Sequence, residues 1–108
     1  MSASINESFI SIVGSYEIDP LDVAAFAKIA TESVEQTVKK PGCLYYIASR
    51  DVRKPNVFHL TEAWATQADL DSHGASPVFK NMLEQAFKLR ILRREIYRSE
   101  SKGRTLLA

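Results

Sequence analysis

The chain has 108 residues, of which 45% are hydrophobic and 25% are charged. A chain of this length buries one core and is expected to form a single domain over residues 1–108, and the proportions exclude a disordered protein. Its 14 lysines and arginines and 13 aspartates and glutamates leave a net charge of +1, which excludes an overall field that attracts nucleic acid or an anionic membrane.

The first predicted element is a strand at residues 8–18, where β-branched and aromatic side chains alternate with period two. Asp19-Pro20 ends this strand, because aspartate can cap a helix and proline suits the first helical turn. Apolar residues at helical spacing then predict a helix from residue 21 to about residue 39. Pro41-Gly42 stops that helix.

Two β-rich runs at residues 43–50 and 56–64 are separated by a polar turn and predict a hairpin with a longer loop. Thr66 can then cap a short helix over residues 67–73. Residues 74–77, which include one glycine and one proline, are expected to break that helix.

An apolar stripe predicts a further helix at residues 78–87, and residues 89–98 predict a fourth strand. Residues 99–108 are interpreted as a mobile tail or an arm laid on a partner. The order β-α-β-β-α-β predicts a ferredoxin-like α+β sandwich with its core at about residues 8–98. In that fold the helices cover one face of a four-stranded antiparallel sheet.

Both faces of the predicted sheet carry apolar residues, whereas a sheet with one solvated face alternates cleanly between apolar and polar. In the first strand, Ile10 and Ile12 share one face while Phe9 and Val13 share the other. A second copy stacked sheet to sheet would cover the second apolar face. We therefore predict a homodimer.

Positive charge is concentrated at the C-terminal end, where residues 88–108 carry a net charge of +5. A basic segment can bind nucleic acid, but no aromatic or glycine-rich RNA-binding pattern accompanies this one. We interpret it as a solvated strand face, or as a contact with the acidic remainder of a second subunit. Nucleic acid is not an expected partner.

Four side chains in the second half of the chain can carry chemistry. Glu62 and Trp64 share a face of the predicted third strand, because side chains two residues apart point the same way. Glu62 either pairs with an arginine or acts as a base, and Trp64 is either a core anchor or a donor of its indole N–H. His59 points the opposite way, toward the predicted interface. His73 either caps the short helix or exchanges a proton near neutral pH.

The single cysteine, Cys43, cannot form an internal disulfide and is interpreted as a packing residue. One thiol and two histidines are too few for a structural zinc site, and no nucleotide, zinc or acyl-enzyme motif is present. We expect no metal site. No apolar stretch approaches the roughly 20 residues that cross a bilayer, and no signal peptide is present, so we expect a cytoplasmic protein with no membrane partner.

Several short motifs follow one another at fixed spacings between about residues 8 and 98: Pro41-Gly42-Cys43-Leu44-x-Tyr46, Asp51…Pro55-Asn56-x-Phe58, Glu62-x-Trp64, Leu70-x-x-His73 and Ser76-x-x-Phe79. The ordered series resembles the antibiotic biosynthesis monooxygenase (ABM) family of the dimeric α+β barrel superfamily. The resemblance implies a ferredoxin-like dimer with a pocket between sheet and helices in each subunit. Members of the family include cofactor-free oxygenases, haem-degrading enzymes, an isomerase of a signalling sugar, and proteins without known activity.

For this chain the resemblance favours a cofactor-independent monooxygenase that oxidises a small aromatic or quinol-type substrate with O2. The substrate anion would supply the electrons, so no cofactor is expected. His73 would take or relay a proton, Trp64 would offer its N–H to a substrate oxygen, and Glu62 is the third expected catalytic residue. The expected substrate-binding residues are mainly aromatic: Tyr46, Phe26, Phe58, Phe79, Leu83 and Phe87.

Other activities of the family fit less well. Its haem-degrading members use an asparagine on the first strand, where this chain has Gly14-Ser15-Tyr16, and some polyketide-tailoring members place an amide where it has Leu60. The alternative is a non-catalytic dimer of the same fold that binds a small metabolite or serves a stress response. A phosphorylated-sugar isomerase would need a basic cluster in the pocket, for which the arginines of the last strand are the only candidates.

Overall fold

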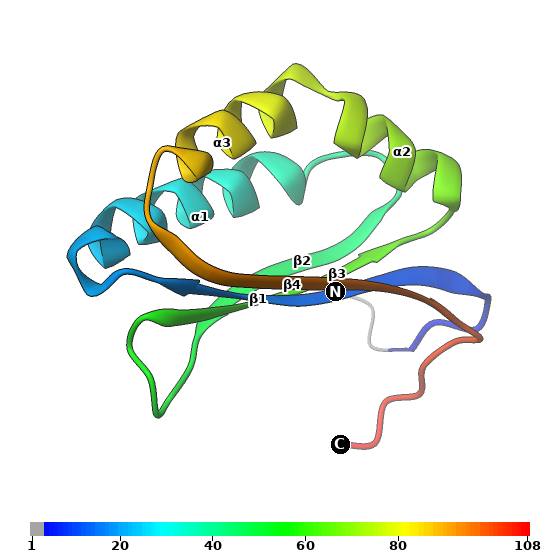
Figure 1. The fold of residues 1–108 in the computed structure, drawn as a ribbon. Helices are drawn as coiled ribbons and strands as arrows, with labels where there is room; N and C mark the ends of the chain where they lie inside the picture. Colours follow the sequence, from blue (N-terminus) through cyan, green and yellow to red (C-terminus); the bar gives the residue numbers. More distant parts are fainter. Residues whose placement is uncertain (1–3) are drawn as a thin grey trace.

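The computed structural model describes residues 4–108 as a four-stranded antiparallel sheet with its helices on one face (Figure 1). The predicted ferredoxin-like α+β fold is confirmed. The elements in chain order are β1 (Phe9–Ile18), the 3-10 helix η1 (Pro20–Asp22), α1 (Val23–Thr37), β2 (Cys43–Arg50), β3 (Val57–Trp64), α2 (Gln67–Ala75), α3 (Pro77–Phe87) and β4 (Ile91–Ser101).

The strand order is β2-β3-β1-β4, so β1 and β3 lie in the middle of the sheet and β2 and β4 form its edges. In the register of these pairs, Glu62 of β3 lies opposite both Ile12 of β1 and Tyr46 of β2. On the other side of β1, Tyr16 lies opposite Arg94 of β4. Paired residues project to the same face of a sheet, so all five of these side chains belong to the face that the helices cover.

The helix starts follow local side-chain chemistry. The Asp19 carboxylate accepts a hydrogen bond from a backbone N–H of η1, and the Thr66 hydroxyl accepts one from the first turn of α2, as predicted. The expected break within residues 74–77 falls at Ser76-Pro77, and α2 continues through Gly74 to Ala75, two residues beyond its predicted end. A residue before proline is driven to extended geometry, and Ser76 has ψ 145°.

Two groups of buried side chains form the core on the helix-covered face. One group packs α1 and α3 onto the sheet and comprises Tyr16, Ile18, Phe26, Phe58 and Ala86. The other comprises Ile10, Ile12, Tyr46 and Trp64 and includes contacts from α2. Removal of this apolar surface from water stabilises the fold by about 25 cal/mol per Å².

Gly14 lies in the middle of β1, on the face that the helices cover. A Cβ atom at this position would collide with the side chain of Ile96 and would lie 2.7 Å from the backbone oxygen of Glu95. The Ile96 side chain therefore occupies the space that a larger residue at position 14 would need.

The opposite face of the sheet carries no helix (Figure 1). Three large apolar side chains are exposed on it: Val13 (52%), Ile47 (52%) and Tyr97 (61%). Within residues 4–108, no helix has the length and apolar character needed to span a membrane.

The segments that flank the sheet pair with each other below this open face. Ile5 and Arg104 form an isolated antiparallel bridge, and the Arg104 guanidinium lies 4.5 Å from the centre of the Tyr45 ring. The last strand also extends further than predicted, because β4 continues to Ser101 rather than ending at residue 98.

Candidate active site

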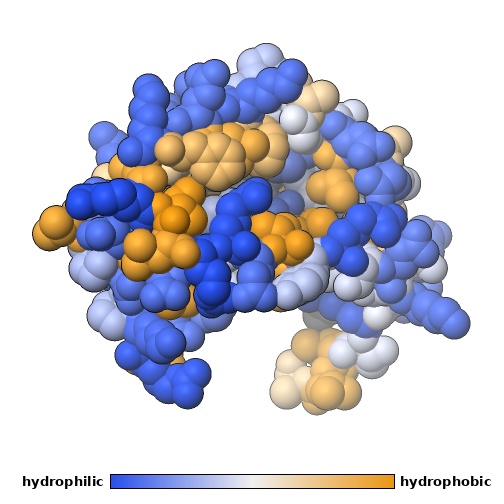
Figure 2. All heavy atoms as spheres, in the orientation of Figure 1, coloured by the Kyte–Doolittle hydropathy of each residue, from blue (hydrophilic) through white to orange (hydrophobic). Residues whose placement is uncertain are grey.

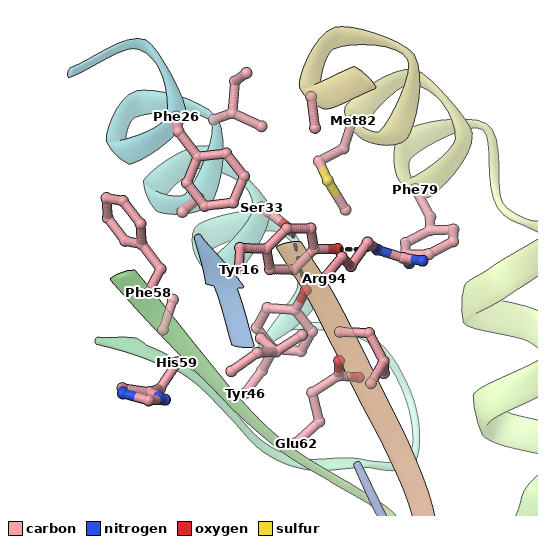
Figure 3. Close-up of a pocket in the computed structure, with 16 residues that line it drawn as sticks. Tyr16, Phe26, Ser33, Tyr46, Phe58, His59, Glu62, Phe79, Met82 and Arg94 are labelled. Carbon is pink, nitrogen blue, oxygen red and sulfur yellow. Dashed lines mark hydrogen bonds between the residues drawn. The ribbon is translucent and has the colours of Figure 1, made fainter. Parts of the chain in front are cut away.

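A largely apolar cavity lies between the sheet and helices α1 and α3 (Figure 3). Its volume is about 90 Å³, which is several times what one water molecule needs. In the space-filling view, apolar side chains gather in the band between the helices and β4 (Figure 2). The larger apolar and aromatic lining residues are Tyr16, Phe26, Ile29, Tyr46, Phe58, Leu60, Phe79, Met82 and Ile96.

Glu62 places a carboxylate in the wall of this cavity (Figure 3). The residue is only 5% exposed, and its Oε1 accepts a hydrogen bond of 2.8 Å from the indole N–H of Trp64. Burial raises the pKa of Glu62, while the bond from Trp64 and the charge of Lys40 oppose that shift. The second oxygen, Oε2, accepts no hydrogen bond from any residue between 4 and 108. A carboxylate with a free oxygen and a raised proton affinity can act as a general base.

Trp64 holds this carboxylate in place and does not itself line the cavity. The prediction that Glu62 and Trp64 share a face is confirmed by the bond between them. The indole N–H, however, is engaged by Glu62 and is not offered to a ligand. Trp64 is completely buried, and its ring stacks on His73 with 4.8 Å between ring centres.

His73 lies behind the cavity wall rather than at its rim. The imidazole is 3% exposed and packs against Trp64, Tyr46 and Phe79, of which the last two line the cavity. Lys40 Nζ lies 2.8 Å from His73 Nδ1 and 2.9 Å from Ser76 Oγ.

The contacts of Lys40 fix the tautomer of His73. The Ser76 hydroxyl donates its hydrogen to the backbone oxygen of His73, so it can only accept from Lys40. An ammonium group has no acceptor, so Lys40 also donates to Nδ1, and the ring proton of the neutral imidazole lies on Nε2. Nε2 is buried and has no hydrogen-bond partner among the described residues.

Burial and the charge of Lys40 lower the pKa of His73 to about 4, from an ordinary value of 6.5. Between these pH values the unfolded chain binds more protons than the folded one, so stability falls as the pH is lowered. We expect the free energy of unfolding to decrease by about 1–3 kcal/mol from this residue between pH 7 and pH 4. Urea denaturation of the wild type and of His73→Gln across this range measures the effect. The free energy of unfolding of the variant is expected to lack this decrease as the pH is lowered. The same decrease in both proteins would contradict the assignment of the lowered pKa to His73.

Other predicted site residues are distributed unevenly around the cavity. Tyr46, Phe26, Phe58 and Phe79 line it, whereas Leu83 and Phe87 are not among its lining residues. Phe87 is 55% exposed because it lies at the last turn of α3. Burial and the neighbouring Glu62 raise the pKa of Tyr46, whose hydroxyl contacts Ser33 Oγ at 3.2 Å.

His59 is among the residues that line the cavity, but its imidazole points away from the cavity, as predicted (Figure 3). Its Nε2 lies 2.9 Å from Asp51 Oδ2. Glu62 contacts no arginine within 4.0 Å in residues 4–108, so the arginine pairing considered for it is not formed.

Sequence reasoning missed Lys40, Ser33 and Tyr16 as members of the site, and it considered the arginines of the last strand, which include Arg94, only for a phosphorylated-sugar substrate. Of these, Ser33 could have been found, since it follows Phe26 by seven residues and therefore shares its helical face. No three His, Cys, Asp or Glu side chains between residues 4 and 108 are grouped so that they could hold a metal ion.

A ferredoxin-like domain with an aromatic pocket between sheet and helices defines a recognisable class of small α+β proteins. The family model described as antibiotic biosynthesis monooxygenase (ABM) matches residues 9–85. The chain belongs to this family.

An individual relative is also similar to part of this chain. The uncharacterized protein sll1783 of Synechocystis sp. is 27% identical over 77 residues, which cover 71% of this chain and only 52% of that protein. The chain thus matches about half the length of this curated relative.

Solved structures share the fold. One from Deinococcus radiodurans has a TM-score of 0.85 and 20% identity, over 92% of this chain and 98% of its own. A conserved protein from Methanosarcina mazei has a TM-score of 0.79 and 23% identity, over 87% and 92%.

Proposed function

We propose that the protein is a cofactor-independent monooxygenase that oxidises a small aromatic or quinol-type substrate with O2. The observation that carries this proposal is the Glu62 carboxylate, which is buried in an apolar aromatic cavity and held by the Trp64 indole with one oxygen free. We place the reaction in the cytoplasm, because the free thiol of Cys43 suits a reducing compartment.

The proposed reaction starts with transfer of the substrate hydroxyl proton to Glu62 Oε2. The resulting anion is electron-rich and gives one electron to O2, and the two radicals then join through a new C–O bond. The peroxide anion takes the proton back from Glu62, and the resulting hydroperoxide loses water as its O–O bond breaks, which leaves a hydroxyquinone. One quinol and one O2 thus yield one hydroxyquinone and one water, and the substrate supplies all four electrons. The apolar lining keeps competing water away from the anion.

Oxygen consumption tests this proposal directly. The purified protein, with chelator and without added flavin or metal, is mixed with reduced 1,4-naphthoquinone in an oxygen electrode. Uptake above the rate without protein, with one atom of 18O from labelled O2 in the product, is the expected result. Binding of the quinol without oxygen uptake would overturn the proposal and favour the non-catalytic metabolite-binding alternative.

We also propose that two copies stack through the open face of the sheet. The exposed Val13, Ile47 and Tyr97 support this, because such a patch on a soluble chain favours a partner of the same kind. Light scattering at micromolar concentration is expected to give twice the mass of the chain, and Val13→Asp is expected to give the single mass. Leu21→Asp, at an 81% exposed site on η1, is the matched control and should remain dimeric. A monomeric wild type would contradict the proposal.

A further inference from the structure

We propose that Arg94 makes this cavity selective for small aromatic acids, that is, ring compounds with a hydroxyl group at one end and a carboxylate at the other. The inference rests on the proposed function for the chemistry at Glu62 and adds the class of substrate. It is carried by the position of Arg94 at the cavity, by the contacts that hold it there, and by the absence of a carboxylate partner for it among residues 4–108.

Arg94 is held over the cavity by aromatic side chains (Figure 3). Its Nε donates a hydrogen bond of 3.0 Å to the hydroxyl of Tyr16. The centre of the guanidinium lies 5.4 Å from the Tyr16 ring and 5.5 Å from the Phe87 ring. These contacts restrict the side chain, while its terminal nitrogens make no hydrogen bond to any residue between 4 and 108. A planar guanidinium matches a carboxylate through two parallel hydrogen bonds.

Neighbouring arginines are neutralised in a different way. Arg90 contacts Asp22, Arg93 contacts Glu17 and Glu95, and Arg98 contacts Glu100, all by ion pairs. Arg94 has no carboxylate within 4.0 Å among residues 4–108, although it lies between these paired residues in sequence.

The partner that Arg94 lacks can come from a ligand. Arg93 points to the open face of the sheet, because it pairs with Glu17, whereas Arg94 pairs with Tyr16 on the helix-covered face. Of the two adjacent arginines, only Arg94 therefore lines the cavity.

Glu62 and Arg94 lie toward opposite ends of this cavity. Along β1, Glu62 is opposite Ile12 and Arg94 is opposite Tyr16, four residues further on. Four residues of a strand span about 13 Å, and Glu62 and Arg94 also lie on opposite sides of β1, about 10 Å apart across the sheet. A ligand with a carboxylate at Arg94 and a hydroxyl directed at Glu62 would satisfy both groups, while its ring contacts the aromatic lining.

Binding of a matched pair of probes tests the inference without any turnover. The probes are 4-hydroxybenzoate and its neutral counterpart 4-hydroxybenzamide, titrated by calorimetry into the wild type, Arg94→Gln and Arg93→Gln. We expect the wild type to bind the acid about tenfold more tightly than the amide, since a hydrogen-bonded charge pair contributes that much. Arg94→Gln should lose this preference. Arg93→Gln removes the same charge from the adjacent residue and should keep it.

Tyr16→Phe provides a second variant with little change in shape. It removes the hydroxyl that holds Arg94 and should reduce the preference for the acid without removing the charge. A wild type without preference, an Arg94→Gln variant that retains it, or tighter binding of a sugar phosphate than of either probe would overturn the inference. Selective binding of the acid without oxygen uptake would refute the proposed monooxygenase and leave the selectivity of Arg94 intact.

Discussion

Replacement of Glu62 by glutamine is expected to lower the rate of oxygen consumption by about 10²- to 10⁴-fold, the usual contribution of a general base. Glutamine keeps the shape of the side chain, and its carbonyl oxygen can still accept from Trp64, but it cannot take the substrate proton. The measurement is the initial rate in an oxygen electrode at saturating naphthoquinol. An unchanged rate would show that Glu62 is not the base.

The same variant is expected to be at least as stable as the wild type. Burial raises the pKa of Glu62, so the folded chain holds this proton more tightly than the unfolded chain. The carboxyl group therefore favours folding most at acidic pH, and this advantage is lost as the pH rises through the folded-state pKa. At pH 7 the buried charge is a net cost, which glutamine removes. Glu84→Gln, at an exposed position of α3, is the matched control and should change neither rate nor stability.

Replacement of Trp64 by phenylalanine is expected to lower the free energy of unfolding by about 2–4 kcal/mol at pH 7. The variant loses a hydrogen bond to a buried charged group, worth about 1.5–3 kcal/mol, and leaves a small void where the indole was completely buried. Urea denaturation measures this change. The pKa of Glu62 should also rise, since the bond from Trp64 normally lowers it, so the pH profile of oxygen uptake should move to higher pH.

A double variant separates the hydrogen bond from simple packing. If Trp64 acts through the Glu62 charge, Trp64→Phe should cost about 1 kcal/mol less in the Glu62→Gln background than in the wild type. The same cost in both backgrounds would assign Trp64 to packing alone.

Much of the fold could be predicted because its signals are local. Period-two alternation identified β1, a β-rich run identified β3, and caps such as Asp19 and Thr66 marked the helix starts. The same period placed Glu62 and Trp64 on one face, which is the central relation of the site. Gly74 misled because a single glycine only weakens a helix, whereas the proline at position 77 ends it.

The missed residues join the site through long-range contacts that local patterns do not encode. Lys40 follows a helix end, where positive charge is already favourable, but its Nζ contacts His73, which is 33 residues away. Arg94 and Tyr16 are 78 residues apart and meet only through the register of β1 and β4. Phe87 continues the apolar stripe of α3, but the helix ends there, so about half of the side chain is exposed to solvent.

The size of the cavity depends partly on a residue that has no side chain. The Ile96 side chain occupies the space beside Gly14 and also lines the cavity. Any larger residue at position 14 would therefore push Ile96 toward the helices or separate β1 from β4. Positions 14 and 96 thus act as one steric unit. To admit larger ligands, a variant would replace Ile96 by a smaller residue and retain Gly14. In relatives that have a larger residue at one of these two positions, we expect a smaller residue at the other.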